Sequence, residues 1–324
     1  MTVQAMNLTK DYGAVRAVNN LSFTLEPGQV TGFLGPNGSG KSTTMRLMLG
    51  LDNGEGLTTW EGLKLPDVPV PAAMVGAHLD AKSFHPGRTA RNHLRMLARA
   101  SDTSNARIDE VLDLMGLRGV AKKRPKGFSL GMAQRLGLAG AILAEPKVLL
   151  LDEPANGLDP QSIQWLRDFL RRYAAEGRVV FVSSHLLNEM QLMADHVIVI
   201  AKGELIADEP MPAFVARSTR NDVFLRTPDV DEFVRILAGK GIGAVREGDD
   251  GISVLGVTTQ AIGDFAHDHQ LRLWELRPRT ASLEEAFLEL TSEDQQFAVG
   301  APGAAGAAPP DQPPAGPDTT EEVG

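Results

Sequence analysis

The chain has 324 residues, of which 43% are hydrophobic and 23% charged, with a net charge of −9 and no cysteine. These values are typical of a soluble globular protein with one large and one small domain, or two modest ones. The negative charge argues against broad electrostatic binding of nucleic acid, and the missing cysteine excludes disulfides, thiolate zinc sites and a thiol nucleophile. Residues 1–12 lack an apolar secretion signal, and no stretch approaches the roughly 20 apolar residues of a membrane span, so we expect a cytoplasmic chain.

Two strands, residues 3–8 and 21–25, are predicted at the start of the chain, with a turn that contains Asp11-Tyr12-Gly13 between them. A lone tyrosine such as Tyr12 is usually a buried aromatic at a sheet edge. Its ring is also able to stack on a nucleotide base, because an aromatic face accepts any purine. The position of Tyr12 shortly before the glycine-rich segment described next favours the second interpretation.

A phosphate-binding pattern follows the predicted strand at residues 29–34. It reads Gly35, Pro36, Asn37, Gly38, Ser39, Gly40, Lys41, Ser42, which fits G-x-x-x-x-G-K-[ST]. The glycines allow the backbone to bend so that its N–H groups face one anion. Lys41 adds a point charge for the β- and γ-phosphates, and the Ser42 hydroxyl is a ligand for Mg²⁺.

The segment after this pattern has helical spacing, with Met45, Met48 and Leu49 on one face and Gly50 as the C-terminal cap. A strand before the loop and a helix after it are the structural context that the pattern requires. We therefore predict that the chain binds a nucleoside triphosphate.

The middle of the chain contains short predicted strands at residues 57–60 and 74–77, an exposed loop at residues 78–88, and helices at residues 92–100 and 108–115. His78, His85 and His93 fall in this region. Their spacings match no helical ligand pair, and no carboxylate or thiol completes a set, so we interpret them as solvated loop histidines rather than a metal site.

A further helix is predicted to begin after Ser129, with Gly131 in its first turn, and to end near Ala144. A serine at this position offers a hydroxyl and backbone N–H groups to an anion, or is a simple N-cap. A buried strand at residues 147–151 then ends in Asp152 and Glu153. One carboxylate at such a strand end is able to hold Mg²⁺ while the next polarises a water.

The following elements continue the alternation of strand and helix. Asp159 and Pro160 are the predicted N-cap and first residue of a helix, and the strand at residues 179–182 leads into Ser183, Ser184 and His185. We expect His185 to share the nucleotide face, since its strand belongs to the same sheet. Residues 197–200 and 204–207 are predicted to form a closing hairpin.

Taken in order, these motifs resemble those of the nucleotide-binding subunit of an ATP-binding cassette (ABC) transporter over residues 1–216. The matches are Walker A (35–42), the signature loop (128–132), Walker B (148–153), the D-loop (156–159), the switch histidine His185 and the A-loop Tyr12. The resemblance implies an α/β P-loop NTPase of ABC ATPase type, with a mixed sheet core over residues 1–218 and a helical subdomain at about residues 78–144.

The resemblance also implies a mechanism. ATP stacks its adenine on Tyr12 and places its phosphates on residues 37–43, up to Thr43, with Mg²⁺ held by Ser42 and, indirectly, Asp152. Glu153 activates the attacking water and His185 contacts the γ-phosphate. Ser129 and Gly131 of a second copy cover that phosphate, and the surface at residues 78–100 docks an integral membrane permease.

Two positions depart from the family pattern. The signature loop keeps Ser129 and Gly131 but reads Phe-Ser-Leu-Gly-Met, and the position of the Q-loop glutamine holds Asp80. A carboxylate at residue 80 is still able to approach Mg²⁺ or water, but it is shorter than glutamine and charged. Glu153 and Lys41 are intact, so we expect turnover.

The C-terminal portion, residues 219–293, is expected to be a small α+β domain. Strands at residues 223–226, 244–247, 252–255 and 271–276 and helices at residues 230–237 and 259–268 give a split βαβ order. Ser282 and Glu285 form a capping box for a last helix with Leu283 and Phe287 on its apolar face. The role of this domain is open between support of a dimer and regulation. Residues 294–324 form an Ala/Gly/Pro-rich tail that we expect to be disordered.

This C-terminal domain resembles that of drug- and antibiotic-resistance ABC exporters of the daunorubicin and bacitracin type. We therefore expect the ATPase subunit of an exporter for a drug, antibiotic or lipid-like molecule, peripheral on the cytoplasmic face of the membrane. The alternatives are a non-transport ABC ATPase and an importer subunit. The single acidic cassette argues against ribosome-associated members, which carry two cassettes and a basic linker.

Overall fold

The computed structural model describes residues 2–80, 84–85, 87–216 and 222–279, together with Leu283 and Phe287. The predicted tail, the expected boundary between residues 218 and 219, and the capping-box pair Ser282 and Glu285 lie outside this set. Within it, no helix combines the length and the apolar character that crossing a membrane requires.

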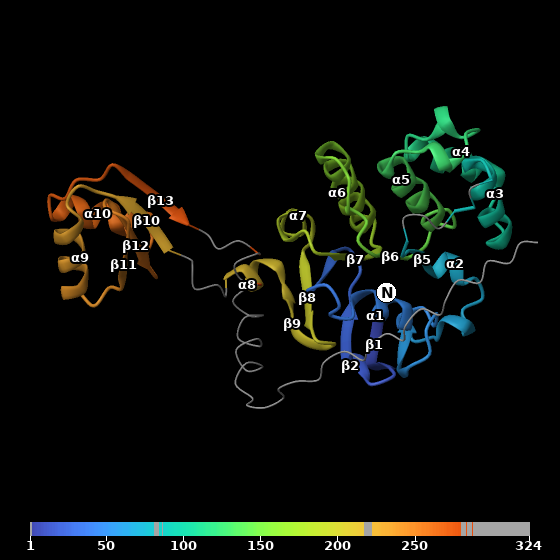
Figure 1. The fold of residues 1–324 in the computed structure, drawn as a ribbon, viewed down its shortest axis with the longest axis horizontal. Coiled ribbons are helices and arrows are strands. Elements are labelled where there is room, and N and C mark those ends of the chain that lie inside the picture. The colour runs from blue at the N-terminus through green and yellow to red at the C-terminus, as the bar shows by residue number, and fades with distance from the viewer. Residues whose placement is uncertain are drawn as a thin grey trace, which may run out of the picture.

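A six-stranded sheet forms the centre of the nucleotide-binding region, in the order β5-β6-β7-β3-β8-β9 (Figure 1). Its strands are β3 (Val30–Leu34), β5 (Val75–His78), β6 (Val148–Leu151), β7 (Val179–Ser184), β8 (His196–Ala201) and β9 (Glu204–Pro210). All neighbours are parallel except β8 and β9, which form the predicted hairpin. Strands β3, β6 and β7 are buried throughout, as parallel strands covered on both faces are. The carboxyl ends of β3, β6 and β7 therefore lie side by side at one edge.

A second, antiparallel sheet has the order β2-β1-β4, with β1 at Val3–Tyr12, β2 at Val15–Leu25 and β4 at Glu55–Trp60. The first two strands are longer than predicted, because β1 and β2 continue past several register shifts to the turn at Gly13. Phe23 of this sheet packs on Phe181 of the central sheet, with ring centroids 5.5 Å apart. This aromatic contact helps to hold the two sheets around one apolar core.

Helices cover the central sheet and extend from one end of it. They are α1 (Lys41–Met48), α2 (Pro71–Met74), α3 (Ala90–Ala100), α4 (Asn105–Leu114), α5 (Leu130–Ala141), α6 (Pro160–Ala175), α7 (Leu187–Met193) and α8 (Met211–Ala216), with 3₁₀ turns at Leu65–Asp67, Arg118–Val120 and Pro125–Gly127. Helices α3, α4 and α5 gather in one group (Figure 1) and begin at the N-caps Thr89, Ser104 and Ser129. Helix α6 begins as predicted, with Asp159 as N-cap and Pro160 at its first position.

The interpretation of the three histidines is wrong for two of them. His78 ends strand β5 and is 3% exposed, while His93 lies in α3 and is 6% exposed. Only His85 is exposed as expected. The sequence pattern failed because β5 is an edge strand that α5 covers, and this contact depends on residues more than fifty positions away.

Burial lowers the pKa of the His93 ring, and Arg88 adds to the effect. Because the unfolded chain then binds a proton near pH 6.5 that the folded chain does not, the free energy of unfolding falls as the pH drops below about 6.5. We expect His93→Leu to reduce this slope by up to about 1.4 kcal/mol per pH unit in urea unfolding between about pH 7.5 and 5. His85→Leu, at an exposed position, is the control. Equal slopes for wild type and His93→Leu would contradict this assignment.

The C-terminal domain has the predicted order of strands and helices. Its elements are β10 (Asp222–Arg226), α9 (Val230–Gly239), β11 (Ala244–Glu247), β12 (Gly251–Leu255), α10 (Thr259–Asp268) and β13 (Glu275–Arg279), and the antiparallel sheet has the order β11-β12-β10-β13. Strand β13 starts later than the predicted residues 271–276. Leu271 donates its N–H to Ala266 to close α10, and pairing with β10 begins only at Glu275, opposite Arg226.

Leu283 and Phe287, predicted on the last helix, are both buried. They belong to the apolar cluster of the nucleotide-binding region, which includes Met190 and Phe214, and the Leu283 N–H donates to Oε1 of Gln191 in α7 at 2.9 Å. These two apolar residues therefore pack with the nucleotide-binding region, not with the separate apolar cluster of the C-terminal sheet.

Candidate active site

The phosphate loop connects the buried strand β3 to helix α1, as the sequence predicted. Gly38 and Gly40 have φ angles of +79° and +105°, which side chains other than glycine rarely adopt. A Cβ atom on Gly35 would lie 2.4 Å from Oγ of Ser39 and 2.5 Å from the carbonyl oxygen of Ile200. The glycines thus allow a tight backbone cradle that a substituted chain would not form.

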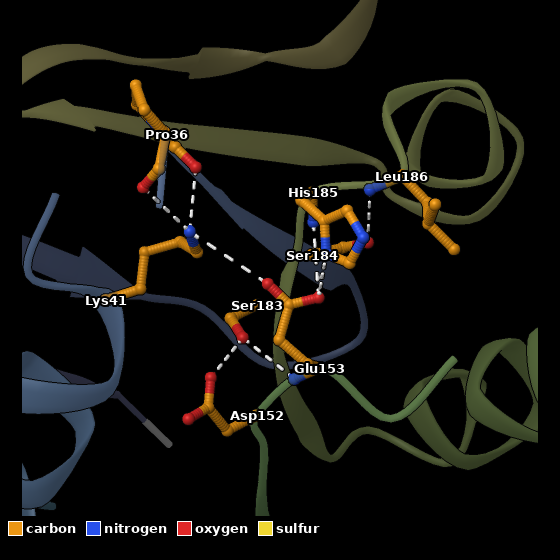
Figure 2. Close-up of polar contacts among 9 residues, drawn as sticks. Pro36, Lys41, Asp152, Glu153, Ser183, Ser184, His185 and Leu186 are labelled. Carbon is orange, nitrogen blue, oxygen red and sulfur yellow. Dashed lines mark hydrogen bonds and ion pairs between the residues drawn. The ribbon is translucent and has the colours of Figure 1, made fainter. Parts of the chain in front are cut away.

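Lys41 lies at the first position of α1 and is 6% exposed. Its Nζ donates to the carbonyl oxygens of Gly35 and Pro36 at 2.7 and 3.2 Å and lies 3.9 Å from Oε1 of Glu153 (Figure 2). Burial lowers the pKa of Lys41, and the carboxylates of Glu153 and Asp152 oppose this effect. A buried cation held over a backbone loop is well placed for an anionic ligand.

Two further side chains of the loop test the fit to a phosphate and a metal ion. Oγ of Ser39 is buried and has no hydrogen-bond partner within the described part of the chain, as expected of a group that a ligand completes. Ser42 is the second residue of α1 and is exposed. Hydroxyl and carboxylate oxygens are the ligands that Mg²⁺ prefers, so Ser42 and Asp152 have the right chemistry to hold it. Pro36, Asn37, Gly38 and Ser42 are exposed, and Thr43 is half-buried.

The two adjacent carboxylates, Asp152 and Glu153, follow directly after β6. Glu153 has a φ angle of +49°, in the left-handed region that is rare for a residue with a side chain. This conformation turns its carboxylate toward Lys41 and His185, while Asp152 faces Ser183 (Figure 2). The two acids therefore have different partners, as separate roles in metal binding and water activation require.

His185 follows β7 and meets Glu153 directly. Its Nδ1 lies 2.7 Å from Oε2 of Glu153, and its backbone N–H donates to the same oxygen at 3.3 Å. The structure thus brings His185 to the edge where the phosphate loop and the carboxylates lie, as we expected from the alternation of strands and helices.

Ser183 is a site residue to which the sequence analysis gave no role. Its hydroxyl is buried, donates to Oδ1 of Asp152 at 2.5 Å and accepts from the N–H of Glu153 at 2.9 Å. Strand β7 extends through Ser184, two residues further than predicted, so the serine side chains belong to the sheet. The signal was a polar residue ending an otherwise apolar strand, but only the strand order shows that β7 lies beside β6 and that Ser183 faces the carboxylates.

Three predicted site residues lie outside this cluster. Tyr12 ends β1, is 50% exposed and donates its hydroxyl to Asp52 at 2.9 Å, so it is not a buried edge aromatic. Ser129 is the exposed N-cap of α5, where its Oγ accepts from the N–H of Met132. No hydrogen bond recorded among the described residues joins Ser129 or Gly131 to the phosphate loop, and α5 is well separated from α1 in Figure 1.

Asp80 lies two residues beyond β5 and is exposed. The roles of Tyr12, Asp80, Ser129 and Gly131 toward ATP remain predictions.

Comparison with known proteins identifies the family. Residues 18–156 match the family model described as ABC transporter. The uncharacterized ABC transporter ATP-binding protein YhcH of Bacillus subtilis is 35% identical over 300 residues, which cover 91% of this chain and 97% of that protein. The chain belongs to the ABC transporter ATP-binding proteins. As a member of this family, it binds and hydrolyses ATP.

Two other similarities concern a transport protein and a solved cassette fold. The bacitracin transport ATP-binding protein BcrA of Bacillus licheniformis is 37% identical over 224 residues, which cover 67% of this chain and 72% of that protein. The solved dimer of an ATP-binding cassette in a post-hydrolysis state with ADP and Pi has a TM-score of 0.57 at 24% identity, and covers 64% of this chain and 98% of that chain. Residues 221–284 match a model described as a domain of unknown function.

Proposed function

We propose that this ABC ATPase powers an exporter of a drug, antibiotic or lipid-like molecule by driving a separate integral membrane permease. The observation that carries the ATP-hydrolysing part of the proposal is the meeting of Lys41, Glu153 and His185 at the carboxyl ends of β3, β6 and β7. The similarity to BcrA, named for bacitracin transport, supports export of an antibiotic-like substrate. Such a subunit would be a peripheral protein on the cytoplasmic face of the membrane.

Each group of the site has a role in hydrolysis. The loop amides and Lys41 bind the phosphates, and the adenine stacks on the exposed ring of Tyr12. Glu153 orients the attacking water and accepts its proton as the bond between the γ-phosphorus and the bridging oxygen breaks, releasing ADP and phosphate. His185 contacts the γ-phosphate and is oriented by Glu153. Mg²⁺ bound by Ser42 and Asp152 would neutralise charge that develops on the phosphate oxygens.

The active unit of this proposal is a head-to-tail dimer. Ser129 and Gly131 begin a helix that lies apart from the phosphate loop of its own chain, so a second copy must supply them to the γ-phosphate (Figure 1). The exposed N-terminus of α5, with a serine hydroxyl and the positive end of the helix dipole, is suited to that anion. The dimeric state of the similar cassette bound to ADP and Pi supports this arrangement.

A groove between β5, α3 and α5 is the proposed docking site for the permease. It has a volume of about 410 Å³, and its lining includes Gly76, His93, Leu97, Ala100 and Gly140. Ala72, Ala100 and Ala144 add short side chains to the lining, so a partner segment meets few bulky groups there. Asp80 lies two residues beyond β5, which forms part of the groove. The groove overlaps the predicted surface at residues 78–100 only in part, through His78, His93, Leu97 and Ala100, and most of its other lining residues belong to β5 and α5.

Co-purification with a six-helix membrane protein encoded beside this chain tests the proposal. Ala100→Arg, which places a long charged side chain in the groove, is expected to reduce the co-purified permease about tenfold or more. Met96→Arg, at an exposed position of α3 outside the groove lining, is the matched control. Cells with the intact pair should accumulate less bacitracin than cells carrying Glu153→Gln. Equal recovery of the permease with both arginine variants would contradict the docking site. Equal accumulation of bacitracin by the two kinds of cell would contradict export of an antibiotic-like substrate.

A further inference from the structure

The side chains of His78 and Gln134 form a buried polar contact between the central sheet and the helix that begins at Ser129. Nε2 of His78 lies 2.6 Å from Oε1 of Gln134. His78 is 3% exposed and Gln134 is 8% exposed. Burial lowers the pKa of His78, so the ring is neutral near pH 7 and its Nε2–H donates to the amide oxygen. A buried hydrogen bond of this kind fixes a relative position that apolar contacts alone leave free to slide.

Two glycines allow β5 and α5 to approach closely enough for this contact. A Cβ atom on Gly137 would lie 2.1 Å from Cε1 of His78, so the ring lies directly against the backbone of α5. A Cβ atom on Gly76 would lie 2.0 Å from the carbonyl oxygen of Ala141. Strand and helix thus meet closely along β5, and the hydrogen bond lies at the His78 end of this backbone contact.

The same contact connects the catalytic carboxylates to the signature loop. The His78 carbonyl oxygen accepts from the N–H of Asp152 at 2.9 Å, and β5 pairs with β6 up to Leu151. On the other side, Gln134 follows the N-cap Ser129 by little more than one helical turn. His78 therefore touches the backbone of the residue before Glu153 and the helix that carries Ser129 and Gly131.

We propose that His78 and Gln134 are positioning residues that fix the signature helix α5 against the carboxylate edge of the sheet. In this way they set the direction in which Ser129 and Gly131 face the nucleotide of the second copy. The inference rests on the head-to-tail dimer of the proposed function. Neither side chain belongs to the phosphate loop, so we expect their loss to weaken the dimer and to leave binding of ATP to Lys41 and its loop intact.

A matched pair of variants isolates the hydrogen bond. His78→Gln keeps an N–H donor near the position of Nε2, whereas His78→Met has similar length and no donor. In the Glu153→Gln background of the full chain, we expect ATP-dependent dimers of His78→Met to dissociate about tenfold more readily than those of His78→Gln, by light scattering over a concentration series. ATP binding to the monomer should be equal in both. Tyr173→Phe, which removes the buried hydrogen bond to Pro146 elsewhere, controls for lost stability.

Amide hydrogen exchange of the monomer without ATP tests the contact independently of the dimer. We expect the peptide covering α5 to exchange several-fold faster in His78→Met than in His78→Gln. Equal exchange and equal dimer affinity would overturn the proposal, and so would faster exchange with unchanged dimer affinity, because the contact would then be structural only. A Glu153→Gln parent that stays monomeric with ATP would refute the dimer itself, and that failure is recognised before any His78 variant is compared.

Discussion

Glu153→Gln is expected to reduce ATP hydrolysis by about 10²–10⁴-fold while ATP binding is retained. The amide keeps the shape of the side chain but cannot accept the proton of the attacking water. The change also removes a negative charge that lies 3.9 Å from Nζ of Lys41 and next to the place of the phosphates. ATP should therefore hold two copies together without being consumed, and the variant should form a dimer only when ATP is present.

Phosphate release and size exclusion with light scattering measure these two effects. Glu176→Gln neutralises an exposed carboxylate at the end of α6 and is the control for net charge. Hydrolysis of ATP by Glu153→Gln at the wild-type rate would show that Glu153 has no part in the chemical step. A variant that is inactive but stays monomeric with ATP would leave Glu153 in place and contradict the shared site.

Ser183→Ala has the second largest expected effect, a fall in kcat of about 10–100-fold with ATP affinity changed less than about threefold. Without the hydroxyl, the N–H of Glu153 loses its acceptor and Asp152 loses its donor. The left-handed backbone at Glu153 costs about 1–3 kcal/mol and persists only when its surroundings hold it. Its carboxylate should then move away from the position set by His185, while the phosphate loop is untouched.

Ser184→Ala is the matched control, because this neighbouring serine is equally buried but accepts from the N–H of Leu186 instead. Steady-state kinetics should show a loss for Ser183→Ala in kcat and little change for Ser184→Ala. Equal losses for both serines would mean that the end of β7 acts only through stability. Unfolding curves of Ser183→Ala and Ser184→Ala show whether a loss in kcat comes with a loss of stability.

The phosphate loop shows which features are predictable from the sequence. Its strand, its glycines and the helix that follows depend on residues within about twenty positions of each other, and backbone conformation at such short range is set by glycine and by apolar spacing. The same holds for the Asp159-Pro160 start of α6 and for the hairpin of β8 and β9. The order of strands and helices in the C-terminal domain was also correct.

Errors arose where the environment of a residue comes from distant segments. The local sequence predicts a solvated loop residue at His78, because nothing near it in the sequence indicates that α5 covers it. Strand β13 begins later than its apolar pattern predicts, because Leu271 closes the preceding helix instead of pairing with β10. Leu283 and Phe287 have an apolar periodicity that is clear from the sequence, but the surface that they pack on is not.

The sequence by itself determined that this chain is an ABC ATPase, because its motifs are local patterns whose order along the chain is distinctive. Only the tertiary structure decided how these patterns meet. The strand order places β7 between β3 and β6, so His185 and Ser183 contact carboxylates about thirty residues earlier in the chain. The packing of helices on the sheet also places α5 on β5, where His78 and Gln134 form a hydrogen bond. The physical reason is that strand pairing and burial join residues far apart in sequence, and local propensity carries no information about such partners.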